Sequence, residues 1–282
     1  MSLVTRFAPS PTGRLHRGHA FSALTAHRAA QGAGGRFLLR IEDIDFTRCR
    51  PEFETGIYED LAWLGLSWET PVRRQSEHMA DYEAALETLR GRGLAYRCFR
   101  TRKEIAESAA SAPHGPGPAF RGEPHSPQEE ARRLAAGEPF AWRLSLEAAE
   151  RALGGFGSLV FLEEGEGPDG RRGVMAARPQ LAGDIVLARK DVGVAYHLAV
   201  VVDDALQGIT HVIRGQDLFE ATHVQRLLQA LLGLPTPVYR HHRLLTGPDG
   251  RRFAKRDRSE TLAELRAAGV TPAQLRKEMG FE

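Results

Sequence analysis

A strand, a turn and a helix follow one another at the start of the chain, and a second strand comes directly after them. Residues 3–8 have the apolar content of a buried strand, and the Pro, Ser and Gly residues that follow predict a turn. Residues 20–30 have the composition of a helix, and residues 36–41 predict the second strand. This spacing is typical of a βαβ unit, whose strands are parallel and joined by a right-handed crossover. We therefore expect an α/β protein with a parallel sheet.

Two polar segments fall at the same edge of this expected sheet. The turn at 6–13 follows the first strand, and the acidic run at 42–45 follows the second. Because ligands of parallel sheets bind beyond the carboxyl ends of the strands, this edge is where we expect a binding site.

The start of the first helix has the features of a phosphate site. Unpaired backbone N–H groups and the helix dipole favour an anion there. His16 and His19 add directional donors, and Gly18 allows a ligand to approach the backbone closely. Taken alone, the pattern also fits a plain Pro/Gly-rich loop with nearby histidines.

Composition indicates an ordinary soluble globular chain. It has 282 residues, 42% hydrophobic and 26% charged, enough for two domains or one elaborated domain. No apolar run approaches the roughly 18 residues of a membrane span. Residues 1–6 lack the apolar core of a signal peptide, so we expect a cytoplasmic protein without membrane contact. The sequence leaves the oligomeric state open.

Two helices are expected after the βαβ unit. They cover 51–66, with Pro51 in the first turn, and 76–90, with Ser76 as N-cap. Near residue 100 the composition changes, and the Ala, Ser, Pro, Gly and His residues of 108–127 predict a loop or linker.

Short strand-like runs then occupy 140–144, 159–162 and 185–188, separated by Gly-rich turns. We interpret about 97–190 as an insertion with its own small sheet.

The α/β pattern returns with 196–204, a strand at 209–215 and an amphipathic helix at 219–232 that Gly233 and Pro235 end. Fewer than 30 residues follow Lys255, which is enough for two short helices and no further domain. The expected division is therefore two halves of one domain at 1–96 and 191–245, the insertion at 97–190, and a final loop with short helices at 246–282.

A basic run lies near the end of the chain, although the net charge of +2 does not require a nucleic-acid partner. Residues 240–258 contain seven Arg or Lys side chains and two histidines, against two acids, Asp249 and Asp257. Such a run suits a polyphosphate or an RNA backbone, and it equally fits a solvated surface loop.

Six segments together closely resemble, in the same order, the catalytic half of class I glutamyl-tRNA synthetases. They are Arg6-Phe7-Ala8-Pro9-Ser10-Pro11-Thr12-Gly13, His16-Arg17-Gly18-His19, Leu39-Arg40-Ile41-Glu42-Asp43, Tyr196-His197-Leu198-Ala199-Val200-Val201-Val202-Asp203-Asp204, Ile213-Arg214-Gly215 and Arg252-Phe253-Ala254-Lys255-Arg256. The resemblance is weakest between about 100 and 180. It implies a Rossmann-like parallel sheet split by an inserted α+β subdomain.

The resemblance also implies which residues form the site. In it, residues 9–19 hold the family's HIGH motif and residues 252–256 its KMSKS motif. His16, Gly18, His19 and Lys255 would bind ATP, and His16, His19 and Lys255 would be catalytic, with Lys255 neutralising charge as pyrophosphate leaves. Glutamate would be held by Arg6, Phe7, Ala8, Pro9, Ser10, Glu42, Tyr196 and Arg214. An arginine can grip a carboxylate with two parallel hydrogen bonds, and Glu42 would pair with the substrate's ammonium group.

The early end of the chain leaves no room for the anticodon-binding domain of a standard glutamyl-tRNA synthetase. The chain therefore resembles the truncated glutamyl-Q tRNA(Asp) synthetases. That family activates glutamate with ATP and transfers it to the queuosine base at the wobble position of tRNA(Asp). Mg²⁺ is expected with ATP, held mostly by phosphate oxygens and water.

Two departures from the family pattern stand out. Many truncated members bind zinc through a Cys-x-Cys pair and two later ligands, whereas this chain keeps only Cys98 there, so zinc is not expected. Arg252 and Ala254 stand where the KMSKS motif usually has Lys and Ser, which keeps a charge and loses a hydroxyl.

Other functions stay open at this point. One is a minimal glutamyl-tRNA synthetase that charges the 3′ end of tRNA, and another is a non-catalytic RNA-binding paralogue. A nucleotidyltransferase of small cofactors would share the paired histidines, but it would not be expected to carry the 6–13 and 39–43 segments together.

Overall fold

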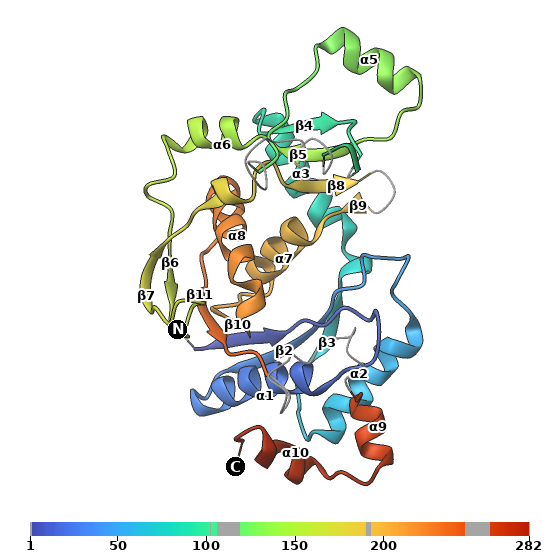
Figure 1. Cartoon of the computed structure of the whole chain (residues 1–282), viewed down its shortest axis with the longest axis vertical. Coiled ribbons are helices and arrows are strands. Elements are labelled where there is room, and N and C mark those ends of the chain that lie inside the picture. The colour runs from blue at the N-terminus through green and yellow to red at the C-terminus, as the bar shows by residue number, and fades with distance from the viewer. Residues whose placement is uncertain (1, 102, 106–118, 190–192, 246–259, 282) are drawn as a thin grey trace.

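The computed structural model describes residues 2–101, 103–105, 119–189, 193–245 and 260–281 (Figure 1). One end of the molecule holds the first three strands with α1, α2 and the two C-terminal helices, and the other end holds β4, β5, β8 and β9 with α5 and α6 (Figure 1). Helices α7 and α8 lie between these ends. None of the helices in the described ranges has the length and apolar composition to cross a membrane.

The expected βαβ unit is present. β1 (Val4–Phe7) pairs in parallel with β2 (Arg36–Ile41), and β2 pairs in parallel with β3 (Glu69–Arg74). The crossover helix α1 (Arg17–Gly32) packs its alanine-rich face on this sheet, with Ala20, Ala23 and Ala26 almost fully buried. The small side chains allow the helix axis to lie close to the strands. Because α1 follows β1 after a turn, its start lies at the carboxyl ends of these strands.

The second half adds parallel strands beside β1. β10 (His211–Gly215) pairs with β11 (Val238–His242), and Thr210 N–H donates to the Val4 carbonyl at 2.9 Å just before β10 begins. Two helices belong to this half, α7 (Tyr196–Leu206) and α8 (Phe219–Leu232). The predicted end of α8 is confirmed, because Gly233 takes a left-handed conformation with φ of 66° as its C-cap.

The strands of 97–190 divide between two sheets, so the expectation that they form one small sheet of their own is wrong. β5 (Ala141–Leu144) and β8 (Val186–Arg189) join an antiparallel sheet with β4 (Ala95–Cys98) and β9 (Gly193–Val194). β6 (Val160–Glu163) and β7 (Gly173–Ala176) instead extend the parallel pair, because β6 pairs in parallel with β11 at Glu163 and Tyr239. The division of the chain at residues 97 and 190 stays a prediction.

The remaining elements are short connecting or covering helices. They are α2 (Pro51–Trp63), η1 (Gln75–Glu77), α3 (Met79–Gly91), α5 (Pro127–Ala135), α6 (Leu146–Leu153), η2 (Pro179–Leu181), η3 (Gln216–Leu218), α9 (Leu262–Ala267) and α10 (Pro272–Glu278). The N-cap of α3 is His78, and not Ser76 as the sequence had predicted. The Ser76 hydroxyl donates to Asp43 Oδ2 at 2.6 Å and so anchors η1 to the end of β2.

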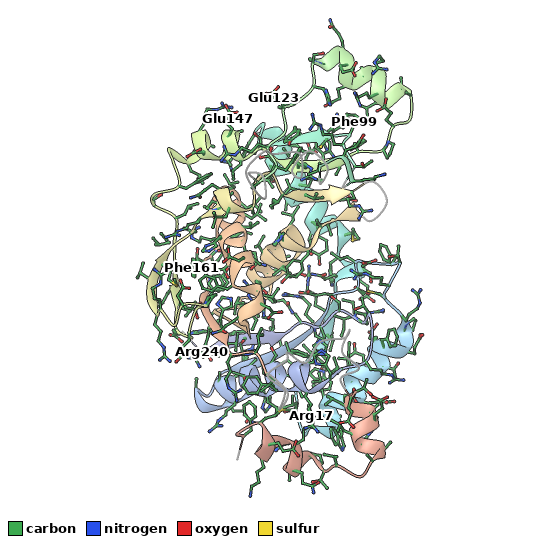
Figure 2. The ribbon with its side chains drawn as sticks, viewed as in Figure 1. Arg17, Phe99, Glu123, Glu147, Phe161 and Arg240 are labelled. Atoms are coloured by element: carbon green, nitrogen blue, oxygen red, sulfur yellow. The ribbon has the colours of Figure 1, made fainter. Side chains whose placement is uncertain are left out.

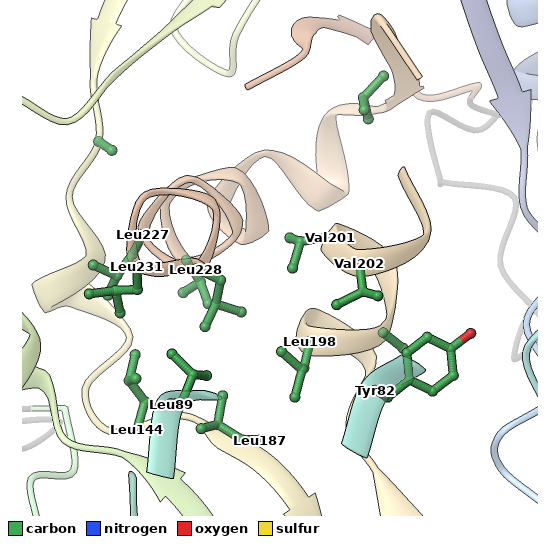
Figure 3. Packing of buried hydrophobic residues seen from close by; sticks show 14 of the residues in the cluster. Tyr82, Leu89, Leu144, Leu187, Leu198, Val201, Val202, Leu227, Leu228 and Leu231 are labelled. Carbon is green, nitrogen blue, oxygen red and sulfur yellow. The ribbon is translucent and has the colours of Figure 1, made fainter. Parts of the chain in front are cut away.

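Two apolar cores hold these layers together. The core of the first half lies between α1, α2 and the β1–β3 sheet and includes Leu39, Ile41 and Leu61. The other core joins the second half to the insertion. Figure 3 shows the leucines and valines of α7 and α8 facing one another above Leu89, Leu144 and Leu187. Burying one such side chain contributes about 1.5–3 kcal/mol, so the insertion is anchored firmly to α7 and α8.

One buried carboxyl group predicts how stability depends on pH. Asp60 of α2 lies 3.7 Å from Arg266 of α9, and neither carboxyl oxygen has a hydrogen-bond partner among the described residues. Burial raises the pKa of Asp60 from 3.8 to about 6. A raised folded-state pKa means that the folded protein is more stable with Asp60 protonated, so stability is lost as the pH rises from 4 through 6.

Asp60→Asn removes this titration. We expect the free energy of unfolding of D60N, relative to the parent chain, to rise by about 2 kcal/mol between pH 4 and pH 7.5. Urea unfolding at several pH values measures it, with the exposed Glu87→Gln as control. A difference that stays constant across this range would contradict the assignment.

Candidate active site

A cavity of about 610 Å³ opens at the carboxyl ends of β1 and β10 and contains residues from both halves of the chain. Every predicted site residue except Lys255 lines it. These residues are Arg6, Phe7, Ala8, Pro9, Ser10, His16, Gly18, His19, Glu42, Tyr196 and Arg214. Lys255, with Arg252 and Ala254, lies outside the described residues. The structure therefore brings together residues that the sequence separates by about 200 positions.

Backbone hydrogen bonds hold the turn after β1. Glu42 N–H donates to the Pro9 carbonyl at 3.1 Å, and Arg50 N–H donates to the Pro11 carbonyl at 3.0 Å. These bonds join the turn to the end of β2 and to the start of α2. Since Pro9 and Pro11 also restrict the backbone, Ala8 and Ser10 have a defined place on the cavity wall.

His16 and His19 cap the first turn of α1, which explains why the helix begins earlier than residue 20. His16 Nδ1 accepts from Gly18 N–H at 3.1 Å, and His19 Nδ1 accepts from His16 N–H at 3.2 Å. The rings stack with their centroids 3.8 Å apart. Because each Nδ1 accepts a hydrogen bond, each neutral ring carries its proton on Nε2.

Gly18 lies close against the His16 ring. A Cβ atom at residue 18 would lie 3.0 Å from His16 Cε1 and 3.1 Å from His16 Nδ1, so the ring would have to move by a few tenths of an ångström. The small residue expected to admit a ligand therefore also admits the capping imidazole.

The outer side of the same helix start contacts the C-terminal helices. Arg17 forms an ion pair with Glu278 of α10, and Figure 2 shows its side chain on the side of the molecule where α9 and α10 lie. The His16 backbone also forms an antiparallel bridge with Thr261. The residues after the undescribed segment 246–259 thus return to the HIGH motif.

A buried ion network lies beneath the cavity and was not predicted. Arg6 donates to both carboxylate oxygens of Asp204, from Nε at 2.9 Å and from Nη2 at 3.2 Å. Arg40, with no exposed surface, donates to Asp204 at 2.7 Å and to Glu42 at 3.0 Å. Burial alone would raise the pKa of Asp204, but the Arg6 and Arg40 guanidinium groups hold it at about 2. Arg6 therefore already has a carboxylate partner within the protein.

Glu42 is only partly neutralised by this network. Burial raises the pKa of Glu42, and the nearby Arg40 and Arg6 oppose that rise. A further cation would stabilise the charged form of a buried carboxylate whose pKa is raised. This agrees with the expectation that Glu42 faces an ammonium group.

Arg214 has a different environment from Arg6. Its three nitrogens donate to His241 Nε2 at 3.2 Å, Gln225 Oε1 at 2.9 Å and Thr222 Oγ1 at 2.7 Å. None of these acceptors is a carboxylate. Tyr196, at the first position of α7, lines the same side of the cavity, and burial raises the pKa of its hydroxyl.

The described residues contain no group of three or more His, Cys, Asp and Glu side chains arranged to hold a metal ion. Cys98 is buried on β4, where Tyr96 donates to Asp184 Oδ2 at 2.8 Å. The Asp184 carboxylate also accepts from the backbone N–H groups of Gly122 at 2.8 Å and Leu146 at 2.9 Å. This carboxylate therefore ties β4 and the start of α6 to the segment around Gly122.

Sequence reasoning missed Arg40, Asp204 and His241. Arg40 and Asp204 stand within apolar runs, and His241 stands in the basic run that predicted a surface contact with phosphates. In the structure His241 is 1% exposed. A charged residue inside an apolar run is the one signal that could have found the first two, since such a residue needs a buried partner.

The parallel sheet with its insertion is that of a class I aminoacyl-tRNA synthetase catalytic domain. Residues 2–280 match the family model for the catalytic domain of class I tRNA synthetases (E and Q), and the chain belongs to this family.

Similar proteins carry two names. A protein of Rhodobacter capsulatus named glutamyl-Q tRNA(Asp) synthetase is 48% identical over 99% of this chain and 100% of its own length, and one of Nocardia farcinica with the same name is 44% identical over 96% and 81%. A glutamate–tRNA ligase of Prochlorococcus marinus is 37% identical over all of this chain and 58% of its own length. Among solved structures, a glutamate tRNA ligase of Elizabethkingia meningosepticum in complex with its amino acid has a TM-score of 0.74 at 28% identity. This match covers 91% of the present chain and 52% of the Elizabethkingia meningosepticum ligase.

The buried network predicts a large cost when Asp204 is neutralised. In Asp204→Asn the guanidinium groups of Arg6 and Arg40 lose their shared carboxylate, and we expect the free energy of unfolding at pH 7 to fall by about 3 kcal/mol. Since a lowered folded-state pKa stabilises only above the unfolded value of 3.8, the loss should shrink as the pH falls from 4 towards 2. Denaturant unfolding measures both effects. The exposed Asp169→Asn is the control, and equal stability of D204N and D169N at pH 7 would contradict the prediction.

Proposed function

We propose that the chain activates L-glutamate with ATP and transfers the glutamyl group to the queuosine base at the wobble position of tRNA(Asp). The observation that carries this proposal is the match over essentially full length to the Rhodobacter capsulatus protein of that name. The cavity supports it, because its polar residues suit a small zwitterion with a second carboxylate next to a polyphosphate. The cytoplasm, expected from the sequence, is where such a reaction would take place.

Glutamate would lie between the two halves of the chain in this proposal. The Glu42 carboxylate would accept from the ammonium group of the substrate, and Arg214 would face the side-chain carboxylate. Phe7, Ala8, Pro9 and Ser10 would form the wall along the substrate, with Tyr196 opposite them. Arg6 would act mainly by fixing Asp204 and by contributing positive potential, since two of its nitrogens already donate to that carboxylate.

ATP would lie over the start of α1. The Nδ1 atoms of His16 and His19 accept from the backbone, so each neutral ring has an Nε2–H group as donor. In this proposal the Nε2–H groups would donate to phosphate oxygens. A glutamate α-carboxylate oxygen would attack the α-phosphorus, and the bond to the bridging oxygen of pyrophosphate would break. Lys255 would neutralise the charge that develops in this step. Mg²⁺ would be bound through the phosphate oxygens.

A second candidate function is the charging of the 3′ end of tRNA(Glu). It is favoured by the Prochlorococcus marinus ligase, which is 37% identical over the whole of this chain. The two functions share the adenylate and differ only in the acceptor, so the acceptor must be tested directly.

The acceptor test uses labelled glutamate, ATP and matched tRNAs. We expect label on queuosine-containing tRNA(Asp), none on the same tRNA without queuosine, and none on the 3′ end of tRNA(Glu). Pyrophosphate exchange should proceed with glutamate and ATP alone, without any tRNA. Equal labelling of the 3′ end of tRNA(Glu) would refute the transfer to queuosine and favour the second candidate.

Lys255→Ala tests the adenylation step. Removing a charge that acts in the transition state costs about 10²–10³-fold in rate, so pyrophosphate exchange should slow by that factor with little change in the glutamate KM. Lys277→Ala, on the exposed side of α10, is the matched control. An exchange rate in K255A equal to that of K277A would overturn the role of Lys255, and no exchange in the unmodified chain would favour the non-catalytic alternative.

A further inference from the structure

We propose that Glu163 and His241 form a buried relay that positions Arg214 and keeps its positive charge available for the side-chain carboxylate of the substrate. This inference rests on the proposed function, because it takes Arg214 as the residue that faces that carboxylate. Glu163 and His241 are positioning residues, since they act through Arg214.

Among the described residues, Arg214 has no carboxylate in direct contact. Arg6 and Arg40 both donate to Asp204, whereas Arg214 donates to an imidazole nitrogen, an amide oxygen and a hydroxyl. Arg214 is 4% exposed and lines the cavity. A buried guanidinium whose neighbours are neutral attracts an incoming carboxylate more strongly than one that is already paired.

His241 must be neutral and carry its proton on Nδ1 for this arrangement to exist. Arginine has no acceptor, so the contact of 3.2 Å from Arg214 Nε requires a lone pair on His241 Nε2. The proton then lies on Nδ1, which is 2.6 Å from Glu163 Oε2. Burial, followed by the nearby Arg214 charge, lowers the pKa of His241, which agrees with a neutral ring despite the opposing effect of Glu163.

Glu163 is itself held in one orientation. Its Oε1 accepts from His241 N–H at 2.9 Å and from Gly165 N–H at 2.8 Å, which leaves Oε2 facing the imidazole. Gly165 fits this turn because a Cβ atom there would lie 2.2 Å from the His241 carbonyl oxygen. The relay therefore crosses three neighbouring strands, from β6 through β11 to β10.

These contacts make Glu163→Gln a variant that reverses the imidazole tautomer. The two backbone donors keep the amide oxygen at the Oε1 position, so the NH₂ group replaces Oε2 and donates to Nδ1. His241 must then carry its proton on Nε2, which has Arg214 Nε at 3.2 Å and the Thr222 hydroxyl at 3.3 Å, so Nε2 can no longer accept from Arg214. We expect the glutamate KM in pyrophosphate exchange to rise at least tenfold, while the ATP KM changes less than twofold. Glu164→Gln, which removes the surface carboxylate paired with Arg240, is the neighbouring control.

A second pair of variants separates positioning from loss of structure. His241→Gln keeps an oxygen acceptor that reaches Arg214, and His241→Asn keeps a donor towards Glu163 but is too short to reach Arg214. Both variants remove the ring, so both should lose a similar amount of thermal stability. The glutamate KM should be closer to that of the parent chain in H241Q than in H241N. Equal KM values in the two variants would show that the ring acts only through packing and would overturn the proposal.

The tautomer can be read without any activity. In ¹⁵N-detected spectra of the imidazole groups, the His241 signal is the one that disappears in H241N. In the parent chain this signal should be that of a neutral ring protonated on Nδ1. In E163Q it should be that of a neutral ring protonated on Nε2. A ring protonated on both nitrogens in the parent chain, or a reversed tautomer in E163Q with an unchanged glutamate KM, would overturn the relay. Absence of glutamate-dependent exchange in the parent chain, with the Nδ1 tautomer present, would overturn the proposed function instead.

Discussion

The shared carboxylate of Asp204 is the interaction on which the arrangement of the site depends. Asp204 comes from α7, Arg6 from β1 and Arg40 from β2, and all three side chains are buried. Each charge would be costly to bury without its partners, so the network is stable only when α7 lies at one position over the sheet. That position brings Tyr196, at the start of α7, to the wall opposite the turn after β1. The buried charges thus fix the width of the cavity more directly than the apolar cores do.

Two kinds of buried arginine lie around this cavity. Arg6 and Arg40 are compensated by carboxylates and hold the two halves of the chain together, whereas Arg214 is surrounded by neutral acceptors. The first arrangement favours rigidity. In the second, Arg214 has no carboxylate in direct contact among the described residues, so its charge can attract an anionic ligand. Residues of the same type can therefore serve structure or recognition, and their partners decide which.

Local patterns predicted those parts of the fold that depend on near neighbours. β2 and α8 have the predicted bounds, and Gly233 ends α8 as expected. α1 begins three residues before the range 20–30 that composition predicted, because His16 and His19, which are not common N-caps, cap its first turn. Ser76 is not the cap of α3 because it lies within η1, where its hydroxyl bonds to Asp43. The site residues that follow strands could be predicted from position, but Asp204 could not, because its partners lie 164 and 198 residues away.

The basic run of 240–258 illustrates the limit of composition as a guide to contacts. Its charges suggested a polyphosphate or RNA surface, yet residues 240–242 of the run belong to β11, where Arg240 pairs with Glu164 and His241 bonds to Glu163. Glu163 is the last residue of β6 and Glu164 follows it directly. β6 reaches β11 only because the insertion sends one hairpin back to the parallel sheet. A strand pairing over about 75 residues leaves no local signal in the sequence. The hairpin of the insertion therefore does more than extend a sheet, because it supplies the carboxylate that sets the protonation of His241 behind Arg214.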